Sequence, residues 1–197
     1  MLSGIKICTT FVTRMLLCPK FYNFTTKYRS MKKFILFSLF IGISVAGFAQ
    51  NAQTMPNIQL KDVNGKTINT GDYSKNGKIT IVSFWATWCT PCKKELTNIN
   101  DNLLDDWKAK YDVVMVAICT DNSRNVPKVK PYVAGQGWEF DCVMDINEDL
   151  KRALNVVTIP HTFLLDQNGK IVYSHNGYTE GDEFVLEEKI KEVAGKK

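Results

Sequence analysis

The sequence predicts an α/β domain built around a mixed β-sheet, and three observations indicate this fold class. Nearly continuous apolar, β-branched runs at residues 78–86 and 111–121 are typical of strands that are covered on both faces. Segments with the 3.6-residue repeat of a helix lie between and after these runs. The stretch at 161–177 predicts a hairpin that turns at Asn168-Gly169, so the sheet also contains antiparallel strands.

The first half of the domain is expected to contain a hairpin, a central strand and a helix. Residues 55–73 alternate in polarity around Asn64-Gly65, which is a strong signal for a β-hairpin. The run "KITIVSFWA" then predicts the central strand at 78–86. After Cys92 the apolar period changes to that of a helix that packs one face inward. The residues that set this period are Leu96, Ile99, Leu103, Leu104, Trp107 and Tyr111.

The second half is expected to contain shorter elements. Residues 125–138 predict a proline-interrupted helix or a loop, and 139–145 a short strand. One or two helical turns follow at 147–156, with Asn147 as the N-cap. An amphipathic helix at 181–195 closes the chain.

The N-terminal region has the layout of a secretory signal peptide. From Met31 the chain has a basic pair, an apolar run at 34–45 and a small-x-small cleavage site at 47–49. The apolar run is too short for a comfortable transmembrane helix. If Met1 is the true start, however, the run would act as an uncleaved membrane anchor with a basic cytoplasmic arm.

This pattern divides the chain into three segments. We expect residues 1–30 to be an upstream segment outside the mature protein, 31–49 a cleaved signal peptide, and 50–197 a domain exported to the periplasm or another extracytoplasmic compartment. Residues 1–49 hold seven of the 25 Lys and Arg and none of the 20 Asp and Glu, which leaves the exported part with a net charge of −2. Such a mixed surface gives no reason to expect nucleic acid or an anionic membrane as a partner.

Two cysteines in the stretch "FWATWCTPCKKEL", residues 84–96, are the main candidates for chemistry. Cys89 is expected where a buried strand ends and a helix begins, and Pro91 suits the first helical turn. The unpaired amides and the dipole of a helix N-terminus stabilise a thiolate, and such placement lowers a cysteine pKa by about one to several units from about 8.5. Cys92, one turn into the helix, is expected to be more buried and able to attack a mixed disulfide formed at Cys89.

The stretches "VSFWATWCTPCKKEL" and "TIPHTFLLDQNGKIV" resemble the thioredoxin superfamily. They are similar to its AhpC/TSA-related redoxins, specifically the exported TlpA, ResA and DsbE group of thiol-disulfide oxidoreductases. The resemblance covers nearly all of the domain. It implies a thioredoxin fold, with three α/β/α layers, a mixed central sheet, an N-terminal β-hairpin and a central helix-strand insertion at about residues 122–145. It also implies that Pro160 is cis and lies against the active-site disulfide, with the backbone of Ile159 offered to the substrate.

The resemblance assigns further roles around the two cysteines. Members close to ResA have a glutamate three residues after the second cysteine that handles a proton, and Glu95 occupies that position. The alternative is an ordinary first-turn glutamate that the helix dipole favours. The expected substrate-binding residues are Ile159, Trp88 and the pair between the cysteines, Thr90 and Pro91.

The predicted function is that of an exported disulfide reductase. The Cys89 thiolate would attack a disulfide in a protein substrate, and Cys92 would resolve the mixed disulfide while Glu95 takes its proton. The family's usual substrates are the haem-binding cysteines of apocytochrome c or other extracytoplasmic proteins. The chain has no nicotinamide motif and no cofactor is expected, so electrons would come from a partner. The resemblance implies that this partner is a membrane thiol transporter of the DsbD or CcdA kind.

Cys119 and Cys142 depart from the plainest family pattern. Cys119 is expected to end one strand and Cys142 to lie in an edge strand beside it. A structural disulfide is favoured because export promotes oxidation of close pairs, while two inert thiols or a second redox pair remain alternatives. The four cysteines lack the spacing of a zinc ribbon, so no metal site is expected. His161 is interpreted as structural or exposed, and His175, beside an Asn-Gly pair, as a turn residue.

Three alternative functions stay open. A disulfide oxidase or isomerase uses the same chemistry, but the "TP" pair between the cysteines is closer to the Gly-Pro of reductases than to the Pro-His of a strong oxidant. A thiol peroxidase needs a Thr-x-x-Cys site with a nearby arginine, whereas this chain has Thr87-Trp88-Cys89 and no obvious arginine. A metal carrier would use Cys89 and Cys92 as soft ligands for Cu(I).

Overall fold

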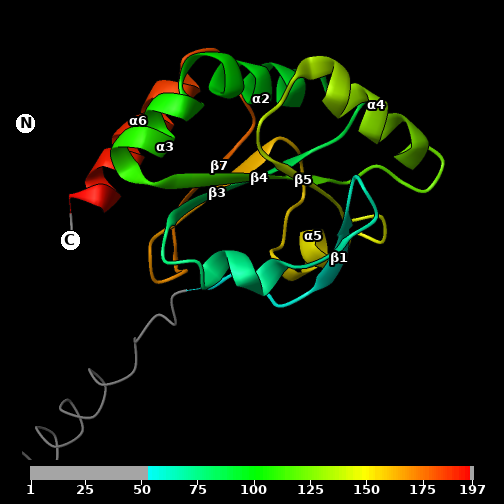
Figure 1. Cartoon of the computed structure of the whole chain (residues 1–197), viewed down its shortest axis with the longest axis horizontal. Coiled ribbons are helices and arrows are strands. Elements are labelled where there is room, and N and C mark those ends of the chain that lie inside the picture. Colours follow the sequence, from blue (N-terminus) through cyan, green and yellow to red (C-terminus); the bar gives the residue numbers. More distant parts are fainter. Residues whose placement is uncertain (1–52, 196–197) are drawn as a thin grey trace, which may run out of the picture. The chain divides into compact units, whose positions relative to one another are not determined.

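The computed structural model describes residues 53–195, and the predicted leader at residues 1–49 lies outside them. In the described part a seven-stranded mixed sheet, in the order β2-β1-β5-β4-β3-β6-β7, has helices on both faces (Figure 1). This is the three-layer α/β/α arrangement that the sequence predicts. No helix within these residues is long and apolar enough to cross a bilayer.

The N-terminal hairpin is formed by β1 (Gln59–Asp62) and β2 (Thr67–Asn69), which pair antiparallel as predicted. Its turn contains Gly65 with a φ of 85°, a left-handed conformation that glycine adopts without steric cost. On its other side β1 pairs antiparallel with β5 (Asp141–Met144). The expectation that Cys142 lies in an edge strand is therefore wrong, because the hairpin extends the sheet beyond β5.

The centre of the sheet is β3 (Ile79–Trp85), the strand predicted from the apolar run. It pairs parallel with β4 (Val113–Cys119) and antiparallel with β6 (His161–Leu165). Every residue of β3 is buried, as expected for a strand covered on both faces. β6 continues into β7 (Ile171–Asn176) through the predicted turn, where Gly169 has a φ of 73°.

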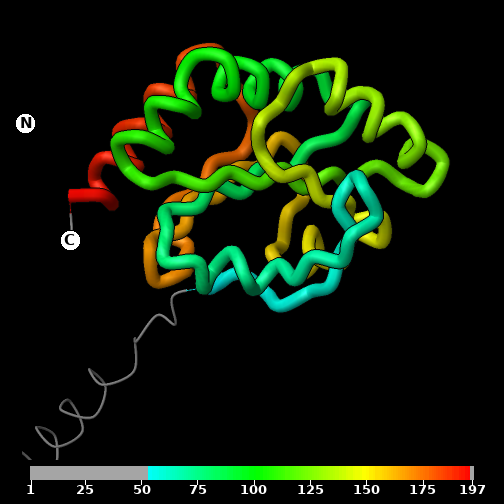
Figure 2. Tube along the Cα trace, viewed as in Figure 1, coloured from blue at the N-terminus to red at the C-terminus, as the bar shows by residue number. Residues whose placement is uncertain are grey.

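One face of the sheet is covered by the longer helices. They are α2 (Thr90–Asn102), α3 (Leu104–Tyr111), α4 (Val126–Gln136) and α6 (Asp182–Ala194). The Cα trace shows α3 and α6 side by side above this face (Figure 2). Their inward side chains form one apolar core with the sheet, and this core also contains the two cysteines of the motif.

The helical segment after the motif is interrupted at Leu103. α2 ends and α3 begins at this residue, whose φ of −132° and ψ of −31° lie outside the helical region. α2 buries Leu96 and Ile99, whereas α3 buries Leu104 and Trp107. The break therefore changes which side chains face the sheet, and the predicted apolar period is divided between two helices.

The opposite face is covered by two short elements, α5 (Asp149–Ala153) and the 3-10 helix η1 (Thr70–Ser74). Leu150 of α5 and Tyr73 of η1 belong to a second apolar core, which contains Phe84 of the central strand. Figure 1 shows α5 below the sheet, on the side away from α2. The two cores differ in composition because successive residues of a strand point to opposite faces.

The start of α5 differs from the prediction. Asn147 does not cap the helix, because the N-cap position is Glu148, whose side chain makes no capping hydrogen bond. The buried Asp145 at the end of β5 supplies the acceptors instead. Its carboxylate accepts hydrogen bonds from the backbone N–H groups of Asp149 and Lys151, both at 2.8 Å. A side chain outside the helix thus satisfies the first-turn amides.

Candidate active site

The Cys89–Cys92 disulfide lies where the central strand passes into helix α2. β3 ends at Trp85, and after a short connection Cys89 is the N-cap of α2. The Cα atoms of the two cysteines are 5.3 Å apart, a usual separation for a disulfide. Cys89 Sγ also accepts a hydrogen bond from the backbone N–H of Cys92 at 3.3 Å. The predicted strand-to-helix placement is confirmed, and one amide of the helix N-terminus points at the first sulfur.

The two cysteines differ in their access to solvent. Cys92 is fully buried, whereas Cys89 is 5% exposed and its neighbour Trp88 is 65% exposed. Thr90 and Pro91 are exposed as well. The side chains predicted to bind substrate therefore surround the sulfur that a second molecule can reach.

The Ile159–Pro160 peptide bond is cis, as the resemblance implies. Pro160 immediately precedes β6, and the pairing of Phe84 with His161 places it at the end of β3 from which the chain leads to Cys89. Ile159 packs against both apolar cores. The cis peptide and the disulfide are therefore at the same end of the sheet.

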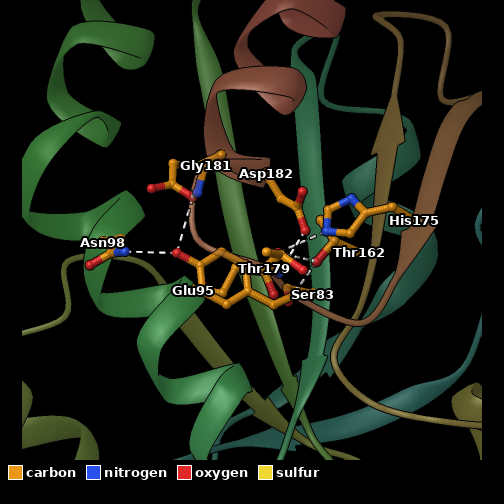
Figure 3. A network of polar contacts seen from close by, with 10 residues as sticks. Ser83, Glu95, Asn98, Thr162, His175, Thr179, Gly181 and Asp182 are labelled. Carbon is orange, nitrogen blue, oxygen red and sulfur yellow. Dashed lines mark hydrogen bonds and ion pairs between the residues drawn. The ribbon is translucent and has the colours of Figure 1, made fainter.

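Glu95 is a buried carboxylate, 1% exposed, on the same face of α2 as Cys92 and one turn after it. Its Oε1 accepts a hydrogen bond from Thr162 Oγ1 at 2.9 Å and lies 3.1 Å from His175 Nε2 (Figure 3). Its other oxygen, Oε2, is buried and has no hydrogen-bond partner within residues 53–195. The alternative, an ordinary first-turn glutamate that the helix dipole favours, is wrong, because Glu95 lies beyond the first turn of α2 and is buried.

The interpretation of His175 as a turn residue is wrong. It belongs to β7 and lies directly opposite Thr162 in the pairing of β6 with β7. Its side chain is 15% exposed and contacts Glu95. His161 is on the other face of the sheet, where its ring stacks on Phe163 with a centroid distance of 4.3 Å. Burial, and then the proximity of His175, lower the pKa of His161.

A second polar cluster joins α2 to the segment before α6 (Figure 3). Asn98 Nδ2 donates to Tyr178 Oη at 2.7 Å, and this hydroxyl donates to Glu183 Oε2 at 3.0 Å. The same carboxylate oxygen accepts a hydrogen bond from the backbone N–H of Gly181 at 3.0 Å. Burial and the Glu183 carboxylate raise the pKa of Tyr178 to about 12, against the opposing effect of Asn98. This cluster fixes α2 against the C-terminal part of the domain.

Asp121, which the sequence analysis did not single out, holds the connection that precedes Cys89. The residue is 1% exposed, and its Oδ2 accepts a hydrogen bond from the backbone N–H of Thr87 at 2.8 Å. The thiol of Cys119 donates to the same oxygen, with a sulfur–oxygen distance of 3.3 Å. Parallel strands end at the same edge of a sheet, so an acidic residue two positions after the end of β4 is the signal that could have identified it.

Cys119 and Cys142 are free, buried thiols, and the favoured disulfide between them is not formed. Cys142 pairs with Ala117, so Cys119 lies two residues further along the neighbouring strand. The strand spacing and the rise per residue put the two cysteine Cα atoms about 8 Å apart, beyond the reach of about 7 Å for a disulfide. Burial raises the pKa of both thiols, that of Cys142 to about 12. The structure therefore agrees with the alternative of two inert thiols.

A groove of about 380 Å³ opens beside the exposed Trp88. The Nζ atom of Lys93 lies 5.4 Å from the ring centroid of Tyr132, a cation–π contact. Tyr132 belongs to α4, within the predicted insertion, so the insertion builds one wall of the groove. The lining contains two lysines and no acidic residue, and it consists of Thr87, Trp88, Lys93, Asn125, Lys128 and Tyr132.

Both the sequence and the structure of this chain are similar to those of known thiol-disulfide oxidoreductases. The AhpC/TSA family model matches residues 52–174. The thiol-disulfide oxidoreductase ResA of Bacillus thuringiensis subsp. konkukian (strain 97-27) is 30% identical over 138 residues, which cover 70% of this chain and 75% of that protein. The disulfide lies at the start of a helix that follows the central strand of a sheet with this strand order. These features together define a protein of the thioredoxin superfamily.

Solved structures extend the likeness over the described fold. The solution structure of an uncharacterized thioredoxin-like protein from Porphyromonas gingivalis has 44% sequence identity and a TM-score of 0.64, and covers 72% of this chain and 92% of its own. A putative thiol:disulfide interchange protein DsbE from Chlorobium tepidum has 26% identity and a TM-score of 0.64, with 73% and 96% covered. The chain belongs to the AhpC/TSA family and, within the thioredoxin superfamily, to the thiol-disulfide oxidoreductases of the TlpA, ResA and DsbE type.

Proposed function

We propose that the chain is an extracytoplasmic reductase of disulfides in exported proteins. The observation that carries this proposal is the difference between the two cysteines of the motif. Cys89 is 5% exposed and lies at the N-terminus of α2, where backbone amides favour a thiolate, whereas Cys92 beside it is fully buried. Such a pair suits a reaction in which one sulfur attacks the substrate and the other attacks only its neighbour.

Reduction proceeds in two exchange steps. The Cys89 thiolate attacks one sulfur of the substrate disulfide, displaces the other as a thiolate and leaves a mixed disulfide. Cys92 then transfers its proton to Glu95 and attacks Cys89 Sγ, which breaks the bond to the substrate. The enzyme keeps the Cys89–Cys92 disulfide, and the substrate leaves with both electrons. Pro160 and Ile159, at the same end of the sheet, would hold the extended backbone of the substrate.

The electrons must come from outside the chain, because the Cys89–Cys92 disulfide has to be reduced again after each turnover. A membrane thiol transporter of the DsbD or CcdA kind is the proposed donor. The signal-peptide pattern at residues 31–49 supports export. Exported proteins with accessible disulfides are the proposed substrate class, and the haem-binding cysteines of apocytochrome c are the first candidates within it.

We infer that the groove beside Trp88 receives the polypeptide next to the substrate's disulfide. The groove is lined by Trp88, the neighbour of Cys89 in the chain, and the exposed ring of Trp88 and the half-buried ring of Tyr132 offer flat apolar surfaces to a peptide. Lys93 and Lys128 make it locally positive in a domain whose overall charge is slightly negative. A segment that carries Asp or Glu is therefore the complementary occupant.

The reduction potential of the Cys89–Cys92 pair tests the proposed direction. It is measured by equilibration with thiol buffers in a chain whose other cysteines, Cys8, Cys18, Cys119 and Cys142, are replaced by serine. A value near or below about −250 mV is expected for a reductant of the thioredoxin type. A value above about −180 mV would place the protein among oxidases or isomerases, and the proposal would have to be abandoned.

A thiol peroxidase is the second candidate, because the matching family model is that of AhpC/TSA proteins. The groove beside Trp88 contains no arginine in its lining, which disfavours this function. The Cys92→Ser variant separates the two activities. A reductase loses turnover in this variant and accumulates mixed disulfides, whereas peroxide consumption that survives the substitution would support a peroxidase.

A further inference from the structure

Three side chains form a polar row across the sheet on the face that α2 covers. Ser83 of β3 pairs with Thr162 of β6, and Thr162 pairs with His175 of β7. Facing positions on neighbouring strands point to the same side of the sheet, so the three side chains converge under the helix. Glu95 is the residue of α2 that meets this row, and Figure 3 shows its contacts with Thr162 and His175.

The hydrogen bonds of this row have one consistent direction. Thr162 Oγ1 lies 2.9 Å from both Glu95 Oε1 and Ser83 Oγ. A hydroxyl has one proton and an ionised carboxylate only accepts, so Thr162 donates to Glu95 and accepts from Ser83. The chain of hydroxyls therefore ends on the carboxylate, as expected where a buried charge has to be stabilised.

The protonation of His175 follows from its surroundings. Its Nδ1 atom is buried and has no hydrogen-bond partner among residues 53–195, whereas Nε2 lies 3.1 Å from Glu95 Oε1. A proton on Nδ1 would be a buried donor without an acceptor, which is costly. The network thus assigns the proton to Nε2, from which it is donated to the carboxylate. Glu95 Oε1 then has two donors, while Oε2 remains free.

We propose that His175 is a positioning residue for the resolving step of the proposed reductase. Its Nε2–H and the Thr162 hydroxyl hold Oε1 of Glu95, which fixes the orientation of the buried carboxylate and leaves Oε2 to receive the proton of Cys92. Cys92 and Glu95 are three residues apart on one helix face, so their Cβ atoms are about 5–6 Å from each other. The inference rests on the proposed function.

The step balances protons and electrons. The Cys92 thiol gives its proton to Glu95 Oε2, and the resulting thiolate forms a bond to Cys89 Sγ. The bond between Cys89 and the substrate sulfur breaks, and the substrate leaves as a thiolate with the electron pair. Glu95 then passes its proton to this thiolate or to solvent. His175 keeps its own proton throughout and is neither oxidised nor reduced.

Other titratable groups face the Glu95–His175 pair from the elements packed around it. A change of charge at any of them would also alter the pH dependence, so each is left intact in the variants below. They are Cys92 on α2, Tyr173 on β7, Tyr178 before α6 and Glu183 in the first turn of α6, while His161 interacts with His175 from the opposite face of the sheet.

The test separates the two exchange steps in the full chain with Cys8, Cys18, Cys119 and Cys142 replaced by serine. Reduced protein is mixed with dithiobis(nitrobenzoate), and stopped-flow absorbance follows the coloured thiolate. Attack by Cys89 releases the first equivalent, and resolution by Cys92 releases the second. The rate of each phase is measured across pH in the wild type and in the variants His175→Leu, His175→Gln and Ser174→Leu.

We expect substitution of His175 to change the pH dependence of the second phase, and to leave the first phase unchanged. In His175→Leu the pH of its half-maximal rate rises by about one to two units, because the buried carboxylate loses a donor to its ionised form. His175→Gln places an amide N–H near the position of Nε2 and keeps the wild-type midpoint. Ser174→Leu makes a comparable substitution at the neighbouring, exposed position of β7 and changes neither phase. A purely structural role would not distinguish glutamine from leucine.

Equal midpoints in His175→Leu and Ser174→Leu would overturn the inference, as would a shift in His175→Gln as large as in His175→Leu. If the leucine variant does not fold, nitrogen NMR of the wild-type imidazole decides, since an Nδ1–H tautomer of His175 contradicts the assignment. Failure of the proposed function has a different signature. In that case the reduction potential of the Cys89–Cys92 pair lies above about −180 mV, whichever phase the variants alter.

Discussion

Cys119 lies two residues beyond the strand partner of Cys142, on the same face of the sheet as the active-site disulfide. The diagonal offset keeps the two thiols apart, and the covering helices keep them from solvent. The thiol of Cys119 also donates to the Asp121 carboxylate, which holds the connection before Cys89. These two cysteines therefore contribute to packing around the motif, and among the cysteines of residues 53–195 only those of the motif form a disulfide.

The two buried thiols are expected to resist alkylation in the folded protein. Burial raises the pKa of Cys142 to about 12, so almost none of this thiol is ionised at pH 8. A raised pKa favours the neutral form, and reactivity should increase only as the pH approaches that value. After reduction, iodoacetamide should modify Cys119 and Cys142 at least about a hundredfold more slowly than Cys89, as followed by peptide mass spectrometry.

Unfolding in guanidinium chloride is the control for this prediction. All cysteines should then react at similar rates, because burial no longer suppresses ionisation. Rapid modification of Cys142 in the folded state would contradict the burial found here and would reopen a redox role for the pair.

Lys128 is expected to favour substrates that carry acidic residues next to their disulfide. The Lys128→Glu substitution reverses a charge in the groove beside Trp88. The second-order rate constant for an acidic peptide disulfide should fall by roughly threefold to tenfold. The rate constant for a peptide with lysine in place of glutamate should increase. The difference should shrink in high salt, since exposed charges are screened over about 10 Å at 0.1 M ionic strength.

Lys130→Glu provides the matched control for this charge reversal. Lys130 is on the same helix and is exposed, but it does not line the groove because two residues turn the side chain about 200° around the helix. Both variants have the same net charge. Equal effects at the two positions would show that only overall charge matters, and the groove would lose its proposed role.

The features that the sequence predicted correctly depend on residues close together in the chain. Cys89 and Cys92 are separated by two residues, and Pro91 in the first turn indicates the helix start. The continuous apolar run of β3 fixes a strand covered on both faces. The hairpin turns at Gly65 and Gly169 are likewise set by adjacent residues.

The features that were missed depend on the pairing of distant strands. The contact of His175 with Glu95 exists only because three strands bring Ser83, Thr162 and His175 into register. Asp121 reaches Thr87 because β3 and β4 end at the same edge of the sheet. A local pattern contains no information on such register, so His175 beside an Asn-Gly pair was taken for part of the turn.

The tip of the terminal hairpin gives a test of how the turn packs on the rest of the domain. Gly169 has a φ of 73°, and a Cβ atom there would overlap the backbone carbonyl oxygen of Ser74, at the end of η1. Gly65 has a similar φ of 85°, but a Cβ atom would meet nothing within 4 Å. Both Gly→Ala substitutions thus share the cost of a left-handed backbone, and only the first adds a steric clash.

Gly65→Ala is therefore expected to lower the free energy of unfolding by about 1 kcal/mol, the backbone cost alone. Gly169→Ala should lower it by about 2–4 kcal/mol, because the rigid backbone of Ser74 has to move as well. Chemical denaturation of the two variants and the wild type gives the comparison directly. Equal losses would mean that the hairpin tip can move away from η1 at little cost, and that the contact between Gly169 and Ser74 does not contribute to holding β6 and β7 in place. A larger loss for Gly169→Ala would show that this contact helps to fix the strand pair that carries Thr162 and His175.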